Sequence, residues 1–390
     1  MRATLPAALL ASAAVALAAR PAHAILCSSL PNPVYVAGSG KVVVADLGKA
    51  LSSSGITLVY KLEGSCLALD SILNGTKITS TAAAPASYWS ATDEMSCDLD
   101  PDGDTVDVGI SDVFPTTCQS LPNGLPNSVG DFQGPVEAYT FVVPKGSSQK
   151  VISARAGYFV AGFGGDSGVS PWTEESAIFH RELSSGTQQL FSVGLGVPAD
   201  RWRGVTVTSS GDMVTKVAGY PLPDLAIGIL TEEVAGANRA TIDVLAYQAK
   251  DQTCGYWPDS TPAAFDKQNV RDGHYELWGP LHLLTRLDNS GYPVNATARD
   301  FIGYLTGTKL PPSGFDLITL LAQSNIVPAC AMQVRRETEL GPLASFAPDR
   351  SCGCYFELTA SGKTDCHECS TDVECPEATP RCNYGYCEAQ

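Results

Sequence analysis

A short stretch in the middle of the chain carries residue types that bind small anions. Residues 181–187, RELSSGT, place a guanidinium and hydroxyl groups directly before an apparent helix that begins near Gln188. The first amides of a helix have no partner within the helix and lie at the positive end of its dipole, so they favour an anion. Arg181 adds a planar fork of donors that fits an oxyanion. Taken alone, however, such a stretch is more often a helix cap with a surface arginine.

Two loops nearer the N-terminus offer matching groups. Residues 38–40, GSG, and residues 63–65, EGS, each present free amides and a hydroxyl between an expected strand and an expected helix. Asp112 ends a further short strand. Ligands of α/β sheets bind where the carboxyl ends of the strands meet. Together with residues 181–187, these loops predict one anion site built from distant parts of the chain.

The segments between these loops indicate an α/β fold. Apolar, β-branched runs alternate with helix-like stretches, and Gly- and Ser-rich loops join them, which is the pattern of βαβ units. We find no internal repeat. The expected strands are residues 56–62, 106–110 and 138–143, and the expected helices are residues 41–53, 67–73 and 150–158.

The order of these motifs resembles that of the phosphate-binding proteins of bacterial phosphate ABC transporters, a branch of the type II periplasmic binding protein family. In that family two Gly/Ser loops and a Ser-Asp pair are followed, in a second lobe, by Trp, Ile and Arg-x-x-x-Ser-Gly-Thr. Residues 226–228, AIG, and residues 272–277, DGHYEL, continue the order, so the resemblance covers residues 34–308. The residues that match the second-lobe pattern are Trp172, Ile178, Arg181, Ser185, Gly186 and Thr187.

The resemblance implies a two-lobed α/β clamp that closes on phosphate or a related oxyanion, without catalysis and without a cofactor or metal. It implies a first lobe of residues 25–136 and 279–349 and a second lobe of residues 137–278. An ABC permease is the partner that such a protein would serve. A cell-surface partner, bound through the cysteine-rich tail, is the alternative. The ligand-binding residues carried over are Ser39, Gly40, Lys41, Ser65 and Asp112 from the first lobe and Arg181, Ser185, Gly186 and Thr187 from the second.

The chain departs from the family pattern at two of these positions. Lys41 stands where the family has a hydroxyl-bearing residue, and Cys66 follows Ser65 where the family prefers small glycines. A cysteine-rich C-terminal tail is also foreign to ordinary transport receptors. This tail suggests an alternative function, a surface or extracellular interaction protein that kept the fold and lost the ligand.

The N-terminus and the cysteine count indicate export. Residues 1–24 are typical of a secretory signal peptide, with an apolar run at residues 5–19 that is too short for a membrane span, which needs about 20 residues. Thirteen cysteines are too many for a reducing compartment unless a metal holds them. Cys27 raises the alternative of a lipoprotein, but Leu26 precedes it where such signals have a small residue. We expect a secreted or periplasmic protein, with association to the cell surface as a further alternative.

Seven of the thirteen cysteines lie in the tail, residues 351–390. This segment has too few aliphatic residues for a core, so we expect disulfides to order it. Residues 366–369, CHEC, are also compatible with half a zinc site, although disulfides are the commoner use in an exported chain. Upstream, Cys97 and Cys118 are candidates to staple the loop around Asp112, and Cys254 is a candidate partner of Cys330. Because thirteen is odd, one thiol is free or pairs with another chain.

Charge and motif spacing exclude several other functions. The formal charge of −16 argues against a nucleic-acid partner, which would need a basic face. Residues 38–41, GSGK, lack the upstream glycine of a phosphate-binding P-loop, and residues 165–168, GDSG, lack the preceding histidine of a trypsin-like protease. The acidic run at residues 98–104 lacks the final Glu of an EF-hand, which leaves a solvated turn or a weak calcium site.

Overall fold

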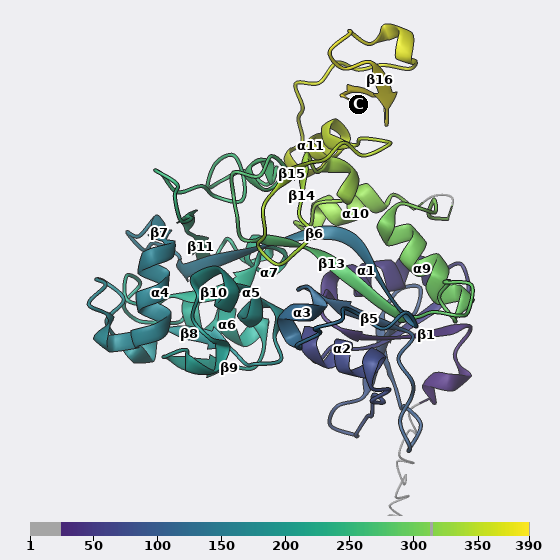
Figure 1. The fold of residues 1–390 in the computed structure, drawn as a ribbon, viewed down its shortest axis with the longest axis horizontal. Coiled ribbons are helices and arrows are strands. Elements are labelled where there is room, and N and C mark those ends of the chain that lie inside the picture. The colour runs from purple at the N-terminus through teal and green to yellow at the C-terminus, as the bar shows by residue number, and fades with distance from the viewer. Residues whose placement is uncertain (1–24, 313–314, 390) are drawn as a thin grey trace, which may run out of the picture.

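Two long strands form the centre of the fold. The computed structural model describes residues 25–389 except residues 313–314, and the predicted signal peptide, residues 1–24, lies outside the described residues. Strand β6 (Val129–Pro144) pairs antiparallel with β13 (Trp278–Arg286). β6 runs from one half of the molecule into the other, with β13 beside it (Figure 1). Both belong to a nine-stranded mixed sheet of order β10-β6-β13-β5-β1-β2-β3-β4, in which β11 also pairs with β6.

The first lobe is a partly parallel sheet flanked by helices. β1 (Pro33–Gly38) pairs in parallel with both β2 (Thr57–Lys61) and β5 (Val108–Ser111), so the carboxyl ends of these three strands meet at one edge. Most of the residues of these three strands are buried. The other elements of this lobe are β3 (Ala86–Trp89), β4 (Glu94–Cys97), α1 (Lys41–Ser52), α2 (Ser65–Leu73), α3 (Pro115–Cys118), α9 (Ala296–Thr306) and α10 (Leu317–Gln323).

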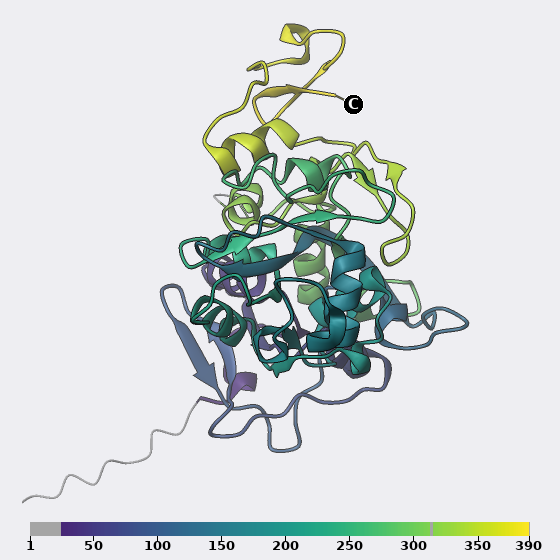
Figure 2. The ribbon, with the colours of Figure 1, turned by 90° about the vertical axis from the view of Figure 1, so that its left-hand side faces the viewer.

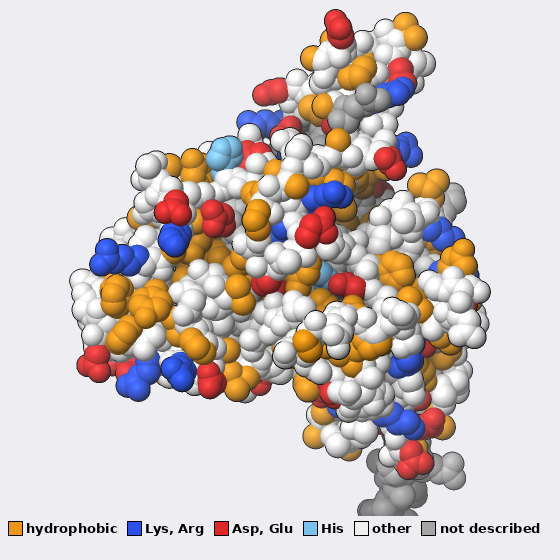
Figure 3. All heavy atoms as spheres, in the orientation of Figure 1, with side chains coloured by type: hydrophobic (Ala, Val, Ile, Leu, Met, Phe, Trp, Pro, Cys, Tyr) orange, Lys and Arg blue, Asp and Glu red, His pale blue; other side chains and the backbone are white. Residues whose placement is uncertain are grey.

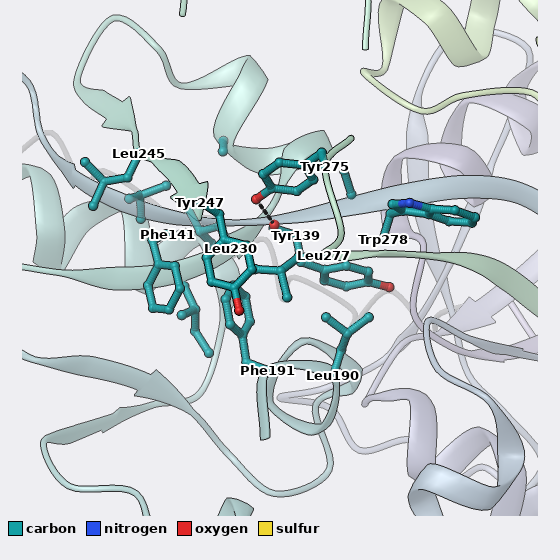
Figure 4. Packing of buried hydrophobic residues seen from close by; sticks show 14 of the residues in the cluster. Tyr139, Phe141, Leu190, Phe191, Leu230, Leu245, Tyr247, Tyr275, Leu277 and Trp278 are labelled. Carbon is teal, nitrogen blue, oxygen red and sulfur yellow. Dashed lines mark hydrogen bonds between the residues drawn. The ribbon is translucent and has the colours of Figure 1, made fainter. Parts of the chain in front are cut away.

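The second lobe packs aromatic side chains of β6 against its own helices. Figure 4 shows Phe141 of β6 beside Phe191 of α5 (Gly186–Leu195), with ring centroids 4.8 Å apart, and the Tyr275 hydroxyl donating to the Tyr139 carbonyl at 2.6 Å. Burying side chains of this size contributes about 1.5–3 kcal/mol each relative to exposure. The elements of this lobe are β7 (Val151–Ser153), α4 (Ala154–Phe163), β8 (Phe179–Arg181), α5 (Gly186–Leu195), β9 (Val205–Val207), α6 (Ser210–Ala218), β10 (Gly228–Thr231), α7 (Glu232–Ala237), β11 (Ile242–Val244), β12 (Ala246–Gln248) and α8 (Gln268–Arg271).

Most of the expected elements form, and one expectation is wrong. The helix predicted at residues 150–158 is a short strand, β7, followed by α4, because residues 151–153 pair with β12. The Ser153 side chain then accepts the Ala156 amide and caps α4. By contrast, α2 and α5 each begin two residues before the predicted start, so Ser65 and Gly186 are the first residues of helices.

The C-terminal tail is attached through a helix that is buried at its N-terminal end. α11 (Gly353–Ser361) packs on α10, and its Phe356 is fully buried in the larger core cluster. Beyond it, the hairpin of β16 (Arg381–Asn383) and β17 (Tyr386–Glu388) projects from the lobes (Figures 1 and 2). The remaining short pair, β14 (Val334–Arg335) and β15 (Ala344–Ser345), lies just before the tail. We keep residues 25–136 with 279–349, residues 137–278 and residues 351–390 as proposed bounds for the lobes and the tail.

The cysteine pairing differs from the predicted one. Cys97 and Cys118 do not bond to each other, and Cys254 is a free, exposed thiol rather than the partner of Cys330. The prediction of a disulfide-rich tail and of one unpaired thiol is confirmed. The CHEC cysteines are both oxidised, so the zinc interpretation is wrong for this form. The disulfides among the described residues are Cys27–Cys97, Cys66–Cys118, Cys330–Cys352, Cys354–Cys366, Cys369–Cys382 and Cys375–Cys387.

Within the described ranges, no helix is both long and apolar enough to cross a membrane. The acidic run at residues 98–104 gathers no three carboxylates at metal-binding distance. In the same ranges, the group of potential ligand atoms that does lie that close consists of Cys369, Cys375 and Cys387, all of which are in disulfides.

Candidate functional site

Three polar side chains meet at the carboxyl edge of β1, β2 and β5. The Ser39 hydroxyl lies 3.0 Å from the Ser65 hydroxyl and donates to the Asp112 carboxylate. The Ser65 oxygen in turn accepts the Asp112 amide at 3.0 Å. The parallel register explains this convergence, because it aligns the ends of the three strands from which these residues follow. The structure therefore brings together three of the predicted site residues, Ser39, Ser65 and Asp112, and their role in binding an anion stays a prediction.

Glycines allow the backbone to turn tightly into the helices here. Gly38 has a φ of +119°, and a Cβ on it would overlap the Ile110 carbonyl. Gly64 also has a φ of +119°, and its Cβ would lie 2.6 Å from the Ser184 carbonyl oxygen of the second lobe. Both values belong to backbone that side chains disfavour. The turns direct the first amides of α1 and α2 toward the same edge of the sheet.

The second lobe contributes the start of α5. A Cβ on Gly186 would overlap the Ser65 hydroxyl and lie 2.9 Å from the Asp112 carboxylate. The Cys66 amide also donates to the Ser184 carbonyl at 3.4 Å, from one lobe to the other. The N-terminus of α5 therefore lies directly against the polar group of the first lobe.

Arg181 lies at the end of β8, beside this junction. Its guanidinium donates to the Ser210 hydroxyl at 2.7 Å and to the Thr208 carbonyl at 3.2 Å. Its Nε is buried and has no hydrogen-bond partner among the described residues. Burial lowers the pKa of Arg181, while the nearby acids Glu182 and Asp112 raise it. A partly desolvated cation with a free donor can bind an anion strongly.

Asp112 is buried beside groups that offset only part of the cost of burying its charge. Burial raises the pKa of its carboxyl, whereas hydrogen bonds from Ser39 and Ser65 and the charges of Arg181 and His282 lower it. The balance of these effects is a raised pKa. Such a carboxyl can accept a hydrogen bond from a protonated ligand at neutral pH and can itself take up a proton at a higher pH than usual.

Most of the other predicted site residues are buried at the starts of helices, but one is exposed to solvent. Gly40 is the left-handed N-cap of α1 and is buried, and Ser185 and Thr187 are buried at the start of α5. Lys41 is exposed, and no contact within the described residues brings its ammonium to Asp112. The His180 ring is hydrogen-bonded to the Arg181 carbonyl at 3.1 Å, so we assign it a structural role beside Arg181 rather than that of a general acid.

A second acidic layer behind Asp112 escaped the sequence analysis. Glu137 of β6 is 1% exposed, and its Oε1 has no hydrogen-bond partner among the described residues. Burial, together with the charges of Asp112 and Glu233, holds the pKa of Glu137 well above its ordinary value. Tyr139 lies on the same strand as Glu137, and its hydroxyl donates to the Asp112 carbonyl at 2.7 Å. The sequence feature that could have revealed this buried acid is that Glu137 stands alone among the apolar residues of β6.

Replacing Glu137 with glutamine should change how stability depends on pH. Because the pKa of Glu137 is raised by folding, its contribution to stability is present below the ordinary value of about 4.3 and is lost as the pH rises through the raised value. The stability of Glu137→Gln relative to the wild type should therefore increase steadily as the pH rises from acidic to alkaline values. Urea unfolding across this range measures the difference. The exposed Glu174→Gln is the control, and a flat difference for Glu137→Gln would contradict the assignment.

Comparison with known proteins identifies the fold. No family model matches the chain, and no curated protein matches it. A Clostridium perfringens protein assigned as the substrate-binding protein of a phosphate ABC transporter, solved with bound phosphate, superposes with a TM-score of 0.50 at 12% identity, covering 76% of this chain and 100% of that one. The fold is the two-lobed α/β fold of periplasmic binding proteins. An ABC-type phosphate transport receptor from Vibrio cholerae gives a TM-score of 0.49 at 15% identity, over 76% of this chain and 99% of the receptor.

Proposed function

We propose that this chain is a solute-binding protein that clamps phosphate, or a closely related tetrahedral oxyanion, between its two lobes. One observation carries the proposal: the N-terminus of α5 in one lobe lies against Ser39, Ser65 and Asp112 of the other. Helix N-termini supply unpaired amide donors, and hydroxyl groups can donate or accept as the ligand requires. The likeness in fold to a protein solved with phosphate supports the same assignment.

Each lobe would contribute different contacts to the anion in the proposed site. Ser39, Ser65 and the amides at the starts of α1 and α2 would donate to oxygens of the anion, and Asp112 would accept the proton that phosphate carries. Arg181 would supply the compensating positive charge from the second lobe. The N-terminal turn of α5, residues 185–187, would complete the shell when the lobes close. None of these roles requires a nucleophile or a general base, so we propose binding rather than catalysis.

The proposed function also implies a compartment and a protein partner. Disulfides such as Cys27–Cys97 and Cys66–Cys118 form in oxidising compartments, which fits a secreted or periplasmic protein. An ABC permease is the proposed partner, since the similar Clostridium perfringens structure is assigned as the substrate-binding protein of an ABC transporter. Acidic and basic side chains are interspersed on the face shown in Figure 3, which fits a protein with no nucleic-acid partner.

One observation favours the second candidate, an extracellular interaction protein that kept the fold but lost the ligand. Ser39, Ser65 and Asp112 already satisfy one another by hydrogen bonds, and the Arg181 guanidinium is bound by Ser210. A ligand would have to replace these bonds. The projecting disulfide-rich tail would be the interaction module in that case.

Calorimetric titration of phosphate into the chain from residue 25 onward separates the two candidates. A saturable signal with a dissociation constant at or below about 1 µM, equivalent to about −8 kcal/mol, is expected of a clamp with a desolvated charge partner. Absence of binding at millimolar phosphate, sulfate and arsenate would favour the interaction protein.

A further inference from the structure

The Cys66–Cys118 disulfide joins the two segments that carry Ser65 and Asp112. Cys66 directly follows Ser65 in the first turn of α2, and Cys118 ends α3, which begins three residues after Asp112. Their Cα atoms are 5.1 Å apart, and 52 residues separate them in the chain. The hydrogen bond from the Asp112 amide to the Ser65 hydroxyl, at 3.0 Å, connects the same two segments. The disulfide and this hydrogen bond therefore hold the same two segments together.

The C-terminal end of α3 has few other anchors, whereas residues 112–115 are buried. α3 has only four residues, too few to be stable by itself. Glu339 accepts hydrogen bonds from the Phe114 amide at 2.9 Å and the Thr117 hydroxyl at 3.0 Å, and so holds the start of the helix. After Cys118, residues 119–128 form a largely exposed connection without a helix or strand. The disulfide is thus the anchor at the end of this segment.

The same disulfide lies next to the contact between the lobes. The Cys66 amide donates to the Ser184 carbonyl at 3.4 Å, and α3 packs against both α2 and α5. Gly186 at the start of α5 fits against Ser65 and Asp112 with no room for a side chain. A shift of α2 relative to α3 would therefore change the surface on which the second lobe closes.

We infer that Cys66 and Cys118 are positioning residues of the oxyanion site: their bond holds Ser65 and Asp112 in the arrangement that binds the anion, so full affinity requires the oxidised form. This inference rests on the proposed function and extends it. Preorganisation of this kind increases affinity because the groups lose less conformational freedom when the ligand binds. Both sulfurs belong to half-buried residues, whereas Cys27 and Cys97 are fully buried.

The test compares two double variants of the chain from residue 25 onward. Cys66→Ala/Cys118→Ala removes the bond at the site, and Cys27→Ala/Cys97→Ala removes a bond of similar span, 70 residues, that ties the N-terminal segment to β4 at the far edge of the sheet. Loops of these lengths constrain the unfolded chain to a similar degree, so both variants should lose comparable thermal stability. Only the first should weaken phosphate binding, by about tenfold or more, as expected for loss of preorganisation.

One further measurement and one further variant keep the outcomes distinct. Hydrogen exchange should accelerate at residues 63–68 and 111–118 in the first variant but not in the second, whether or not a ligand binds. If the alanine variant does not fold, Cys66→Val/Cys118→Ala restores part of the lost volume. If the wild type binds phosphate and both variants bind it equally well, the inference is overturned. If the wild type binds no oxyanion, the proposed function fails, and the exchange pattern still decides whether the disulfide orders these loops.

Discussion

Replacing Arg181 with methionine should weaken phosphate binding by about 2–5 kcal/mol, the usual cost of removing one partner from a desolvated charge pair. This corresponds to a dissociation constant roughly 30-fold to several thousand-fold higher. Arg181 is the basic residue of the second lobe whose charge acts on Asp112, its side chain is half-buried, and its Nε is buried with no partner among the described residues. Methionine keeps most of the volume and removes the charge, so calorimetric titration reports mainly on the lost electrostatic contact.

A matched control separates this effect from a general change of charge. Arg203 lies in the same lobe and pairs at 3.3 Å with Glu175, but both side chains are about half exposed. Exposed pairs contribute about 0–1 kcal/mol, so Arg203→Met should leave phosphate affinity within about twofold. Equal affinities in the wild type and Arg181→Met would place the anion elsewhere and remove Arg181 from the site.

Replacing Asp112 with asparagine should cost the protein much of its preference for phosphate over sulfate. A buried carboxylate accepts a hydrogen bond from a phosphate that carries a proton, but it faces unrelieved repulsion from sulfate, which carries none at neutral pH. Sites that depend on such a buried hydrogen bond can discriminate by a factor of about 10⁴ or more. Competition titrations on the wild type and Asp112→Asn measure the ratio. Asp243→Asn, which alters a surface pair with Lys145, is the control.

The pH dependence of selectivity supplies an independent check of Asp112. Burial raises its pKa, so the carboxyl becomes protonated at a higher pH than an ordinary aspartate. A neutral carboxyl can donate to sulfate, so the preference of the wild type for phosphate should fall as the pH falls through this raised value. Asp112→Asn has nothing to titrate at this position and should show a much flatter ratio. A wild type that binds sulfate and phosphate equally at neutral pH would contradict the proposed role.

The local parts of the site follow from the sequence by itself. Glycines at residues 38 and 64 allow tight turns between a strand and a helix, and serines next to them place hydroxyls at helix N-termini, whatever surrounds them. Alternating strands and helices indicated the α/β fold, and the cysteine count indicated disulfides and one unpaired thiol. These features depend on residues that are close together in the chain, so the local sequence pattern is enough to predict them.

Only the tertiary structure decided which distant groups meet. The pairing of Cys66 with Cys118 depends on how α2 and α3 pack, and no spacing in the sequence distinguishes it from the predicted alternative of Cys97 with Cys118. The burial of Glu137 behind Asp112 depends on the position of β6 in the middle of the sheet. Residues 151–153 form a strand because β12, almost a hundred residues later, offers them backbone partners. In each case the deciding interaction joins segments far apart in the chain, whose proximity is set by burial of the shared core rather than by local propensity.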